Sequence, residues 1–190
     1  GHIFPAISIA NALKASDSTI EILFVGAKGK MEMEKVPAAG YKIVGLPVAG
    51  FHRKLNIKNI LRNTLFPFKL LASMTKAGSV IRNFKPDVVV GVGGYASGPI
   101  LRRAAKKGIP CLIQEQNSYP GVTNKILAKD VRKICVAYPD MDRFFPSDKI
   151  LVTGNPVRQS LLTHVDREEA ASHFGLNPNL PIILVVGGSL

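Results

Sequence analysis

The residues best suited to bind a ligand or move a proton lie in glycine-rich turns beside expected helices. One such turn, residues 91–99 (GVGGYASGP), follows three valines, and another, residues 187–189, follows the last apolar run. Gly1 and His2 precede the first helical pattern and would complete a third turn. Glycine allows a tight turn, and a helix N-terminus offers unpaired N–H groups to an anion. Such turns also occur without ligands, but three of them favour a binding site, in which His2 could be a base or a hydrogen-bond donor.

A second group of polar residues leaves the strand expected at residues 110–113. It consists of Gln114, Glu115, Gln116 and Asn117. Polar side chains next to a buried strand cost free energy unless they form hydrogen bonds. They either cap the helix expected from residue 122 or line a polar cleft beside the 93–98 turn, and we favour the cleft.

Arg158 follows another expected strand, in the sequence TGNPVR. Its planar guanidinium could bind a phosphate or a uracil carbonyl, or it could be an exposed solubilising residue.

Of the remaining candidates, His52, His164 and His173 have no partner at metal-ligand spacing. Cys111 and Cys135 fall within expected strands, where buried, inert thiols are the default. The sequence therefore predicts no metal site.

The elements that must position these residues alternate between strands and helices. Strands are expected at residues 20–25, 41–46, 87–91, 110–113, 133–136, 150–153 and 182–186. Helices are expected at residues 5–14, 30–39, 57–83, 98–107, 122–128 and 167–174. The strands are continuous apolar runs rich in Val and Ile, as in a sheet covered on both faces. This alternation predicts a doubly wound α/β fold with a parallel sheet.

Composition limits the class of protein. The chain has 190 residues, 46% of them hydrophobic, and a net charge of +12. This is too apolar for a disordered chain, and two cysteines cannot form a disulfide framework. No run approaches the ~20 apolar residues that span a bilayer, and no signal peptide opens the chain. We expect a soluble, basic protein whose charge favours polyanions: nucleic acid, phosphorylated ligands or an anionic membrane.

The positive charge is concentrated in residues 35–86, which contain ten Lys or Arg and no acidic residue. Within them Phe68, Leu71 and Met74 recur every three residues, with Lys69 and Lys76 alongside. This pattern fits an ordinary amphipathic helix packed on the sheet, or a peripheral membrane patch for anionic lipid. Nucleic acid is disfavoured, because no recognisable binding motif is present.

Five motifs become specific in combination: GHIFPA, KPDVVVGVGGYASGP, QEQNSYPGVTNKILAK, TGNPVR and VVGGSL. In this order and spacing they closely resemble the MurG family of bacterial N-acetylglucosaminyltransferases, over essentially the whole chain. The resemblance implies a two-domain GT-B fold. Residues 1–158 would be the N-terminal, acceptor- and membrane-binding domain without its first strand. Residues 159–190 would be a linker and the first strand of the UDP-GlcNAc-binding domain.

The resemblance also implies an activity. The family transfers N-acetylglucosamine from UDP-GlcNAc, with inversion, to the C4 hydroxyl of undecaprenyl-pyrophosphoryl-MurNAc-pentapeptide. This converts lipid I to lipid II in peptidoglycan synthesis, at the cytoplasmic face of the inner membrane. No cofactor or metal is implied. Because most donor contacts would lie beyond residue 190, we expect this segment alone to be inactive.

Roles carry over where residues match the family motifs. His2 is the favoured base, and Glu115 a second catalytic candidate. The matches to donor-binding positions are Gly1, Asn117, Arg158 and Ser189. The matches to acceptor or cleft positions are Gly93, Gly94, Tyr95 and Asn124. Phe68, Leu71 and Met74, with Lys69 and Lys76, match the membrane patch. Gln114 stands where many members have His, so an imidazole role there is not expected. Two alternatives remain: another GT-B lipid glycosyltransferase, or a non-catalytic membrane-docking half of a split transferase.

Overall fold

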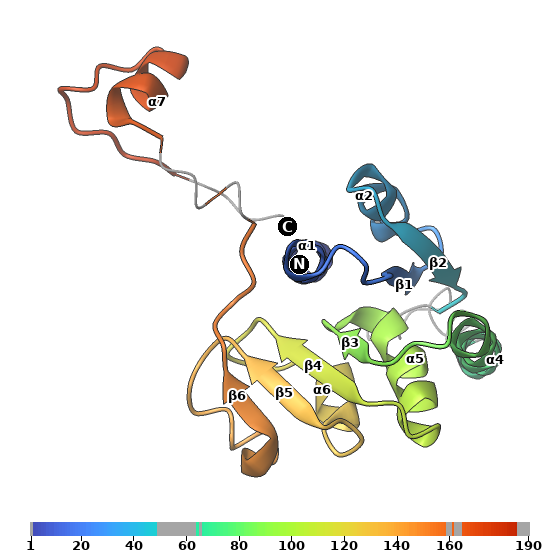
Figure 1. Ribbon diagram of the computed structural model, residues 1–190. Coiled ribbons are helices and arrows are strands. Elements are labelled where there is room, and N and C mark those ends of the chain that lie inside the picture. The colour runs from blue at the N-terminus through green and yellow to red at the C-terminus, as the bar shows by residue number, and fades with distance from the viewer. Residues whose placement is uncertain (1, 49–63, 65, 159–160, 162–164, 186–190) are drawn as a thin grey trace. The chain divides into compact units, whose positions relative to one another are not determined.

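The computed structural model describes residues 2–48, 64, 66–158, 161 and 165–185 (Figure 1). The chain divides into two compact units, Gly1–Val157 and Arg158–Leu190. The strands of the first unit are β1 (Leu23–Ala27), β2 (Lys42–Leu46), β3 (Val89–Gly91), β4 (Cys111–Glu115), β5 (Lys133–Val136) and β6 (Ile150–Val152). Its α-helices are α1 (Ile3–Ser16), α2 (Glu32–Ala38), α4 (Phe66–Phe84), α5 (Gly94–Lys106) and α6 (Val122–Leu127). A short 3₁₀-helix, η1 (Ser147–Lys149), precedes β6.

The strands form two parallel sheets, β1-β2 and β3-β4-β5-β6. Helices connect successive strands in most cases, as parallel pairing requires. The expected parallel α/β architecture is therefore confirmed. Among the described residues, β1 pairs only with β2, and β3 only with β4.

Helix α5 packs closely against β3. The N-terminus of α5 lies at the carboxyl end of that strand. A Cβ added at Gly91 would clash with Leu101 Cδ1, so a larger residue here would force the buried Leu101 side chain to move. Leu101 and Ala104 of α5 are fully buried, as is Ile113 of β4. Helix α5 also lies beside α4 (Figure 1). The buried residues of α4 are Ser73, Ala77 and Ile81, which are four positions apart and therefore lie on one face of the helix.

Two expectations about secondary structure need correction. Helix α5 begins at Gly94, not at residue 98, because the positive φ of Gly93 (98°) completes the turn at once. The Ser97 hydroxyl then donates to Gly93 O at 2.5 Å within the first helical turn. The strand expected at residues 182–186 is absent over residues 182–185, which are exposed coil, and residue 186 lies outside the described residues. A strand needs a pairing partner, and the described part of the second unit contains none.

The second unit contains one described α-helix, α7 (Arg167–His173). Asp166 caps it by accepting a hydrogen bond from Glu168 N at 2.8 Å. The Arg167 guanidinium donates to Pro178 O and Leu180 O, both at 2.9 Å, which ties the following segment to the helix.

The residues of the expected membrane patch lie on α4 and differ in exposure. Phe68 and Leu71 are 71% and 65% exposed, whereas Met74 is half-buried beside the buried Ser73. Arg103 of α5 donates to Met74 O at 3.0 Å, on the side of α4 that packs against α5. Lys69 and Lys76 are exposed. The exposed apolar patch is therefore Phe68 and Leu71, with Met74 at its edge. None of the helices described here is long and apolar enough to cross a bilayer.

Candidate active site

His2 lies directly over the glycine turn between β3 and α5. A Cβ added at Gly93 would approach Cε1 and Nδ1 of His2 to 2.8 Å, and one at Gly94 would lie 3.6 Å from its Cδ2. Both glycines have positive φ, 98° and 78°, which side chains rarely tolerate. Glycine at residue 93 is thus required twice, for its backbone conformation and for the space that the imidazole occupies.

The imidazole is joined to the end of β4 by Gln116. His2 Nδ1 lies 2.9 Å from Gln116 Oε1. Gln116 Nε2 donates to Val92 O at 3.0 Å, to Gln114 O at 3.2 Å and to Gln114 Oε1. These contacts connect the start of α1, the end of β3 and the end of β4, which are far apart in the sequence.

The turn after β6 joins the same network. Asn155 Nδ2 donates to Gln116 O at 3.3 Å, and Gln114 Nε2 donates to Asn155 Oδ1 at 3.5 Å. We call His2, Gln114, Gln116 and Asn155 the polar cluster. It lies at the carboxyl ends of β3, β4 and β6, where open parallel sheets bind their ligands.

Glu115 faces away from the polar cluster and organises the segment that leads into α6. It is 1% exposed. One carboxylate oxygen, Oε1, accepts from Asn117 N (3.0 Å) and Asn117 Nδ2 (2.9 Å). The other, Oε2, accepts from Gly121 N (3.1 Å) and Asn124 Nδ2 (2.8 Å). Four donors and no acceptor surround it, which suits an acceptor-only carboxylate.

The alternation of side chains along β4 explains this separation. Successive residues of a strand point to opposite faces, so Gln114 and Gln116 share one side and Glu115 takes the other. The sequence indicated a polar cleft or a helix cap as alternatives for this run. The structure divides the run between two sets of contacts: the glutamines contact His2 and Asn155, while Glu115 accepts from Gly121 N in the turn before α6.

The other expected site residues differ in their exposure and in the unit to which they belong. Tyr95, in the first turn of α5, is 54% exposed. Asn124 is 1% exposed, and its Oδ1 has no hydrogen-bond partner in the described part of the chain. Arg158 belongs to the second unit. Gly1 and Ser189 lie outside the described residues.

Sequence reasoning placed Gln116 in the polar group after the strand expected at residues 110–113 and Asn155 in the TGNPVR motif, but it gave neither residue a role of its own. Their motifs, QEQN and TGNPVR, had been recognised, but no local pattern distinguishes these two members. A usable signal is the period of two: if Gln114 projects from the end of β4 toward the ligand side, Gln116 must do so too.

The thiols have the properties expected of packed cysteines. Burial raises the pKa of the Cys111 thiol, with a further contribution from the negative charge of Asp130. Burial also raises the pKa of Cys135, against the opposing hydrogen bond with Thr153. Both thiols are therefore held in the unreactive protonated form at neutral pH.

Among the described residues, no group of three His, Cys, Asp or Glu could hold a metal ion. His52 and His164 lie outside those residues.

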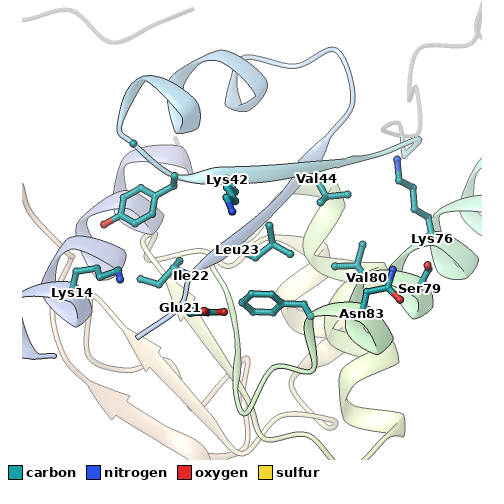
Figure 2. Close-up of a pocket in the computed structure, with 13 residues that line it drawn as sticks. Lys14, Glu21, Ile22, Leu23, Lys42, Val44, Lys76, Ser79, Val80 and Asn83 are labelled. Carbon is teal, nitrogen blue, oxygen red and sulfur yellow. The ribbon is translucent and has the colours of Figure 1, made fainter. Parts of the chain in front are cut away.

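A cavity of about 750 Å³ lies elsewhere in the first unit (Figure 2). It opens at the amino ends of β1 and β2, and Lys14, Leu23, Lys42 and Phe84 are among its lining residues. It shares no residue with the polar cluster. Because parallel sheets bind ligands at the opposite, carboxyl ends of their strands, we do not assign the substrate to it.

Gly93→Ala is expected to destabilise the full-length protein by about 1–3 kcal/mol, the typical cost of forcing a side chain into a glycine-only conformation. The added methyl would also displace His2. Gly98→Ala is the matched control, because its Cβ would make only a 3.6 Å contact with Thr123 Cγ2 and its φ is not positive. Urea unfolding of both variants tests this. Equal stability of the two would contradict the close packing of His2 on the turn.

A parallel α/β fold with a glycine turn and converging polar side chains at the strand ends defines a Rossmann-like ligand-binding domain. A profile of the glycosyltransferase family 28 N-terminal domain matches residues 1–136. The chain therefore belongs to glycosyltransferase family 28.

Named relatives agree with this assignment and with the resemblance inferred from the motifs. The chain is 62% identical, over its whole length, to the UDP-N-acetylglucosamine--N-acetylmuramyl-(pentapeptide) pyrophosphoryl-undecaprenol N-acetylglucosamine transferase of Phocaeicola vulgatus. It spans about half the length of the curated relatives that it matches, 50% of this one.

Two solved structures are similar. The crystal structure of Acinetobacter baumannii MurG is 30% identical, with a TM-score of 0.67, and the match covers 80% of this chain and 42% of that one. UDP-GlcNAc 2-epimerase from Neisseria meningitidis, bound to UDP-GlcNAc, has a TM-score of 0.59 over 92% of this chain and 49% of its own. At 16% identity, this second likeness shows the fold alone.

Proposed function

We propose that the full-length protein containing this chain transfers N-acetylglucosamine from UDP-GlcNAc to undecaprenyl-pyrophosphoryl-MurNAc-pentapeptide, converting lipid I to lipid II in peptidoglycan synthesis. The observation that carries the proposal is the placement of His2 over the Gly93-Gly94 turn, hydrogen-bonded to the end of β4, in a family 28 fold. The substrates are taken from the names of relatives whose match includes the whole of this chain.

In the proposed reaction, the C4 hydroxyl of the acceptor attacks the anomeric carbon of GlcNAc. The new O4–C1 bond forms as the bond from C1 to the UDP phosphate oxygen breaks, with inversion. His2 accepts the hydroxyl proton, and the electron pair of the broken bond leaves with UDP. General-base catalysis of this kind contributes about 10²–10⁴-fold to the rate.

Stabilisation of the departing UDP needs positive charge or N–H donors. We assign this to Arg158, as the sequence motif suggests, together with Gly1, Asn117 and Ser189 as donor-binding residues. Tyr95, exposed beside Gly94, is available to contact the acceptor. No metal or other cofactor is required by this scheme.

Glu115 takes a different role from the catalytic one expected from the sequence. Both carboxylate oxygens are occupied by two donors each, and the side chain is 1% exposed. We therefore assign Glu115 as a positioning residue for the 117–124 segment. Asn124, equally buried, supports Glu115 rather than contacting the acceptor directly.

The direct test is a transfer assay with the full-length protein. We expect radiolabelled GlcNAc to pass from UDP-GlcNAc to a lipid I analogue, and not to diacylglycerol. Transfer to diacylglycerol alone would favour another lipid glycosyltransferase. Failure with every acceptor, by a folded protein, would favour a non-catalytic membrane-docking subunit.

Membrane association at the cytoplasmic face of the inner membrane belongs to the same proposal. The exposed side chains of Phe68 and Leu71 supply apolar contact area on α4, and Lys69 and Lys76 supply charge for anionic headgroups. A peripheral position would bring the enzyme to a lipid-linked acceptor.

Phe68→Asp combined with Leu71→Asp is expected to reduce binding to vesicles containing phosphatidylglycerol by at least about tenfold. Each change removes apolar contact worth more than 1 kcal/mol and adds a charge that anionic lipid repels. Cosedimentation of the full-length protein measures this. Met31→Asp, at a 61% exposed residue before α2, is the control and should bind nearly as the wild type does. Equal binding by the double variant would exclude this patch as the anchor.

A further inference from the structure

The contacts of Gln116 define which atom of its side chain faces His2. Three oxygens surround one end of the amide: Val92 O, Gln114 O and Gln114 Oε1. Oxygen acceptors need a donor, so this end must be the NH₂ group. The other end, which lies 2.9 Å from His2 Nδ1, is therefore the carbonyl oxygen Oε1.

This orientation determines the proton on the imidazole. Gln116 Oε1 can only accept a hydrogen bond, so His2 Nδ1 must donate one. In the neutral ring only one nitrogen carries a proton, which leaves Nε2 with a free lone pair. In the described part of the chain, Nε2 has no hydrogen-bond partner.

We infer that Gln116 is a positioning residue that holds His2 in the Nδ1–H tautomer, so that Nε2 is the atom that accepts the proton from the substrate hydroxyl. This inference rests on the proposed function for its catalytic meaning, but the tautomer itself is independent of any reaction. Val92 O supports the same arrangement from the end of β3, because it fixes the amide of Gln116 against rotation.

The glycine turn contributes to the same arrangement. The imidazole rests on Gly93 and Gly94, so the ring is restrained both by its contact surface and by one hydrogen bond. A half-turn of the ring about the Cβ–Cγ bond would place Cδ2 where Nδ1 lies and would lose the hydrogen bond to Gln116 Oε1. The protein therefore selects both the ring position and the tautomer.

The first experiment measures the tautomer in the unmodified full-length protein. Histidine is labelled with ¹⁵N, and long-range ¹H–¹⁵N correlation spectra are recorded at a pH where the imidazole is neutral. The His2 signals are assigned by their loss in His2→Asn. We expect the pattern of a protonated Nδ1 and an unprotonated Nε2. The opposite pattern, a protonated Nε2, would overturn the inference without reference to activity.

The second experiment removes the acceptor. Gln116→Met has nearly the same length but no oxygen, so the His2 tautomers should redistribute toward Nε2–H. We expect kcat for transfer to fall by about ten- to a hundredfold with little change in KM, less than the loss of a general base because the imidazole remains. Gln114→Met is the matched control: two acceptors still hold the Gln116 amide, so the His2 tautomer should not change.

The outcomes separate the two proposals. If the spectra show Nδ1–H and Gln116→Met alters them, but His2→Asn retains full transfer, the tautomer assignment stands and the catalytic role of His2 fails. If Gln116→Met leaves the tautomer unchanged, or if Gln114→Met alters it as much, Gln116 does not set it. Circular dichroism of both variants establishes that they are folded, and the wild-type spectrum decides the tautomer even if they are not.

Discussion

Replacing His2 by asparagine in the full-length protein is expected to lower kcat for GlcNAc transfer by about 10²–10⁴-fold. The asparagine amide nitrogen can occupy the position of Nδ1 and still donate to Gln116 Oε1, so the network around Gln116 should survive. Only the lone pair of Nε2 is removed. Steady-state kinetics with UDP-GlcNAc and a lipid I analogue should show the loss in kcat, with KM changed little.

The control for this substitution is His173→Asn. His173 is exposed at the end of α7, where it contacts Phe174 edge-on at a centroid distance of 4.9 Å, and it belongs to the second unit. Because His173 is exposed and is not a member of the polar cluster, this substitution should leave kcat within about twofold. If the two variants have equal rates, His2 is not the base, and the function of its position over Gly93 is structural.

Replacing Glu115 by glutamine is expected to destabilise the protein by about 2–5 kcal/mol. Each carboxylate oxygen accepts from one backbone N–H and one asparagine amide, so whichever oxygen becomes NH₂ will leave a backbone N–H without an acceptor and force an asparagine amide to turn. A buried donor left without an acceptor costs about 1–3 kcal/mol. Urea unfolding followed by circular dichroism measures the change in the free energy of unfolding.

Glu32→Gln is the matched control for this second prediction. Glu32 accepts one hydrogen bond, from Ala27 N at 2.9 Å, and a glutamine carbonyl can accept it equally well. Its cost should be below about 1 kcal/mol, the net value of one ordinary hydrogen bond. If Glu115→Gln costs no more than Glu32→Gln, the four hydrogen bonds do not hold the 117–124 segment in place.

Much of the fold follows from local sequence patterns. The strand expected at residues 133–136 matches β5, and the expected strand at residues 41–46 differs from β2 by one residue at its start. Continuous apolar runs predict buried parallel strands because both faces of such strands are covered. The start of α5 was missed by four residues, because a single positive φ at Gly93 ends the turn and no pattern in composition marks that angle.

The candidate site was predicted in its parts but not in its connections. Glycine turns, the QEQN run and His2 were each recognisable from the sequence, because residue type and position after a strand are local properties. The family resemblance implied a catalytic role for Glu115. Its burial and its four donors became apparent only when the turn to α6 was folded around it.

The sequence alone determined the family resemblance, the parallel α/β class and the set of polar residues at the ends of the strands. Motif spacing and apolar runs are local properties, so they can be recognised without the tertiary structure. Only the tertiary structure decided that Gln116, 114 positions away from His2, contacts its imidazole, and that Met74 is half-buried on α4. Such contacts depend on the register of β3 against β4 and on how α4 packs against α5. Register and packing arise from the whole core at once, so no local pattern specifies them.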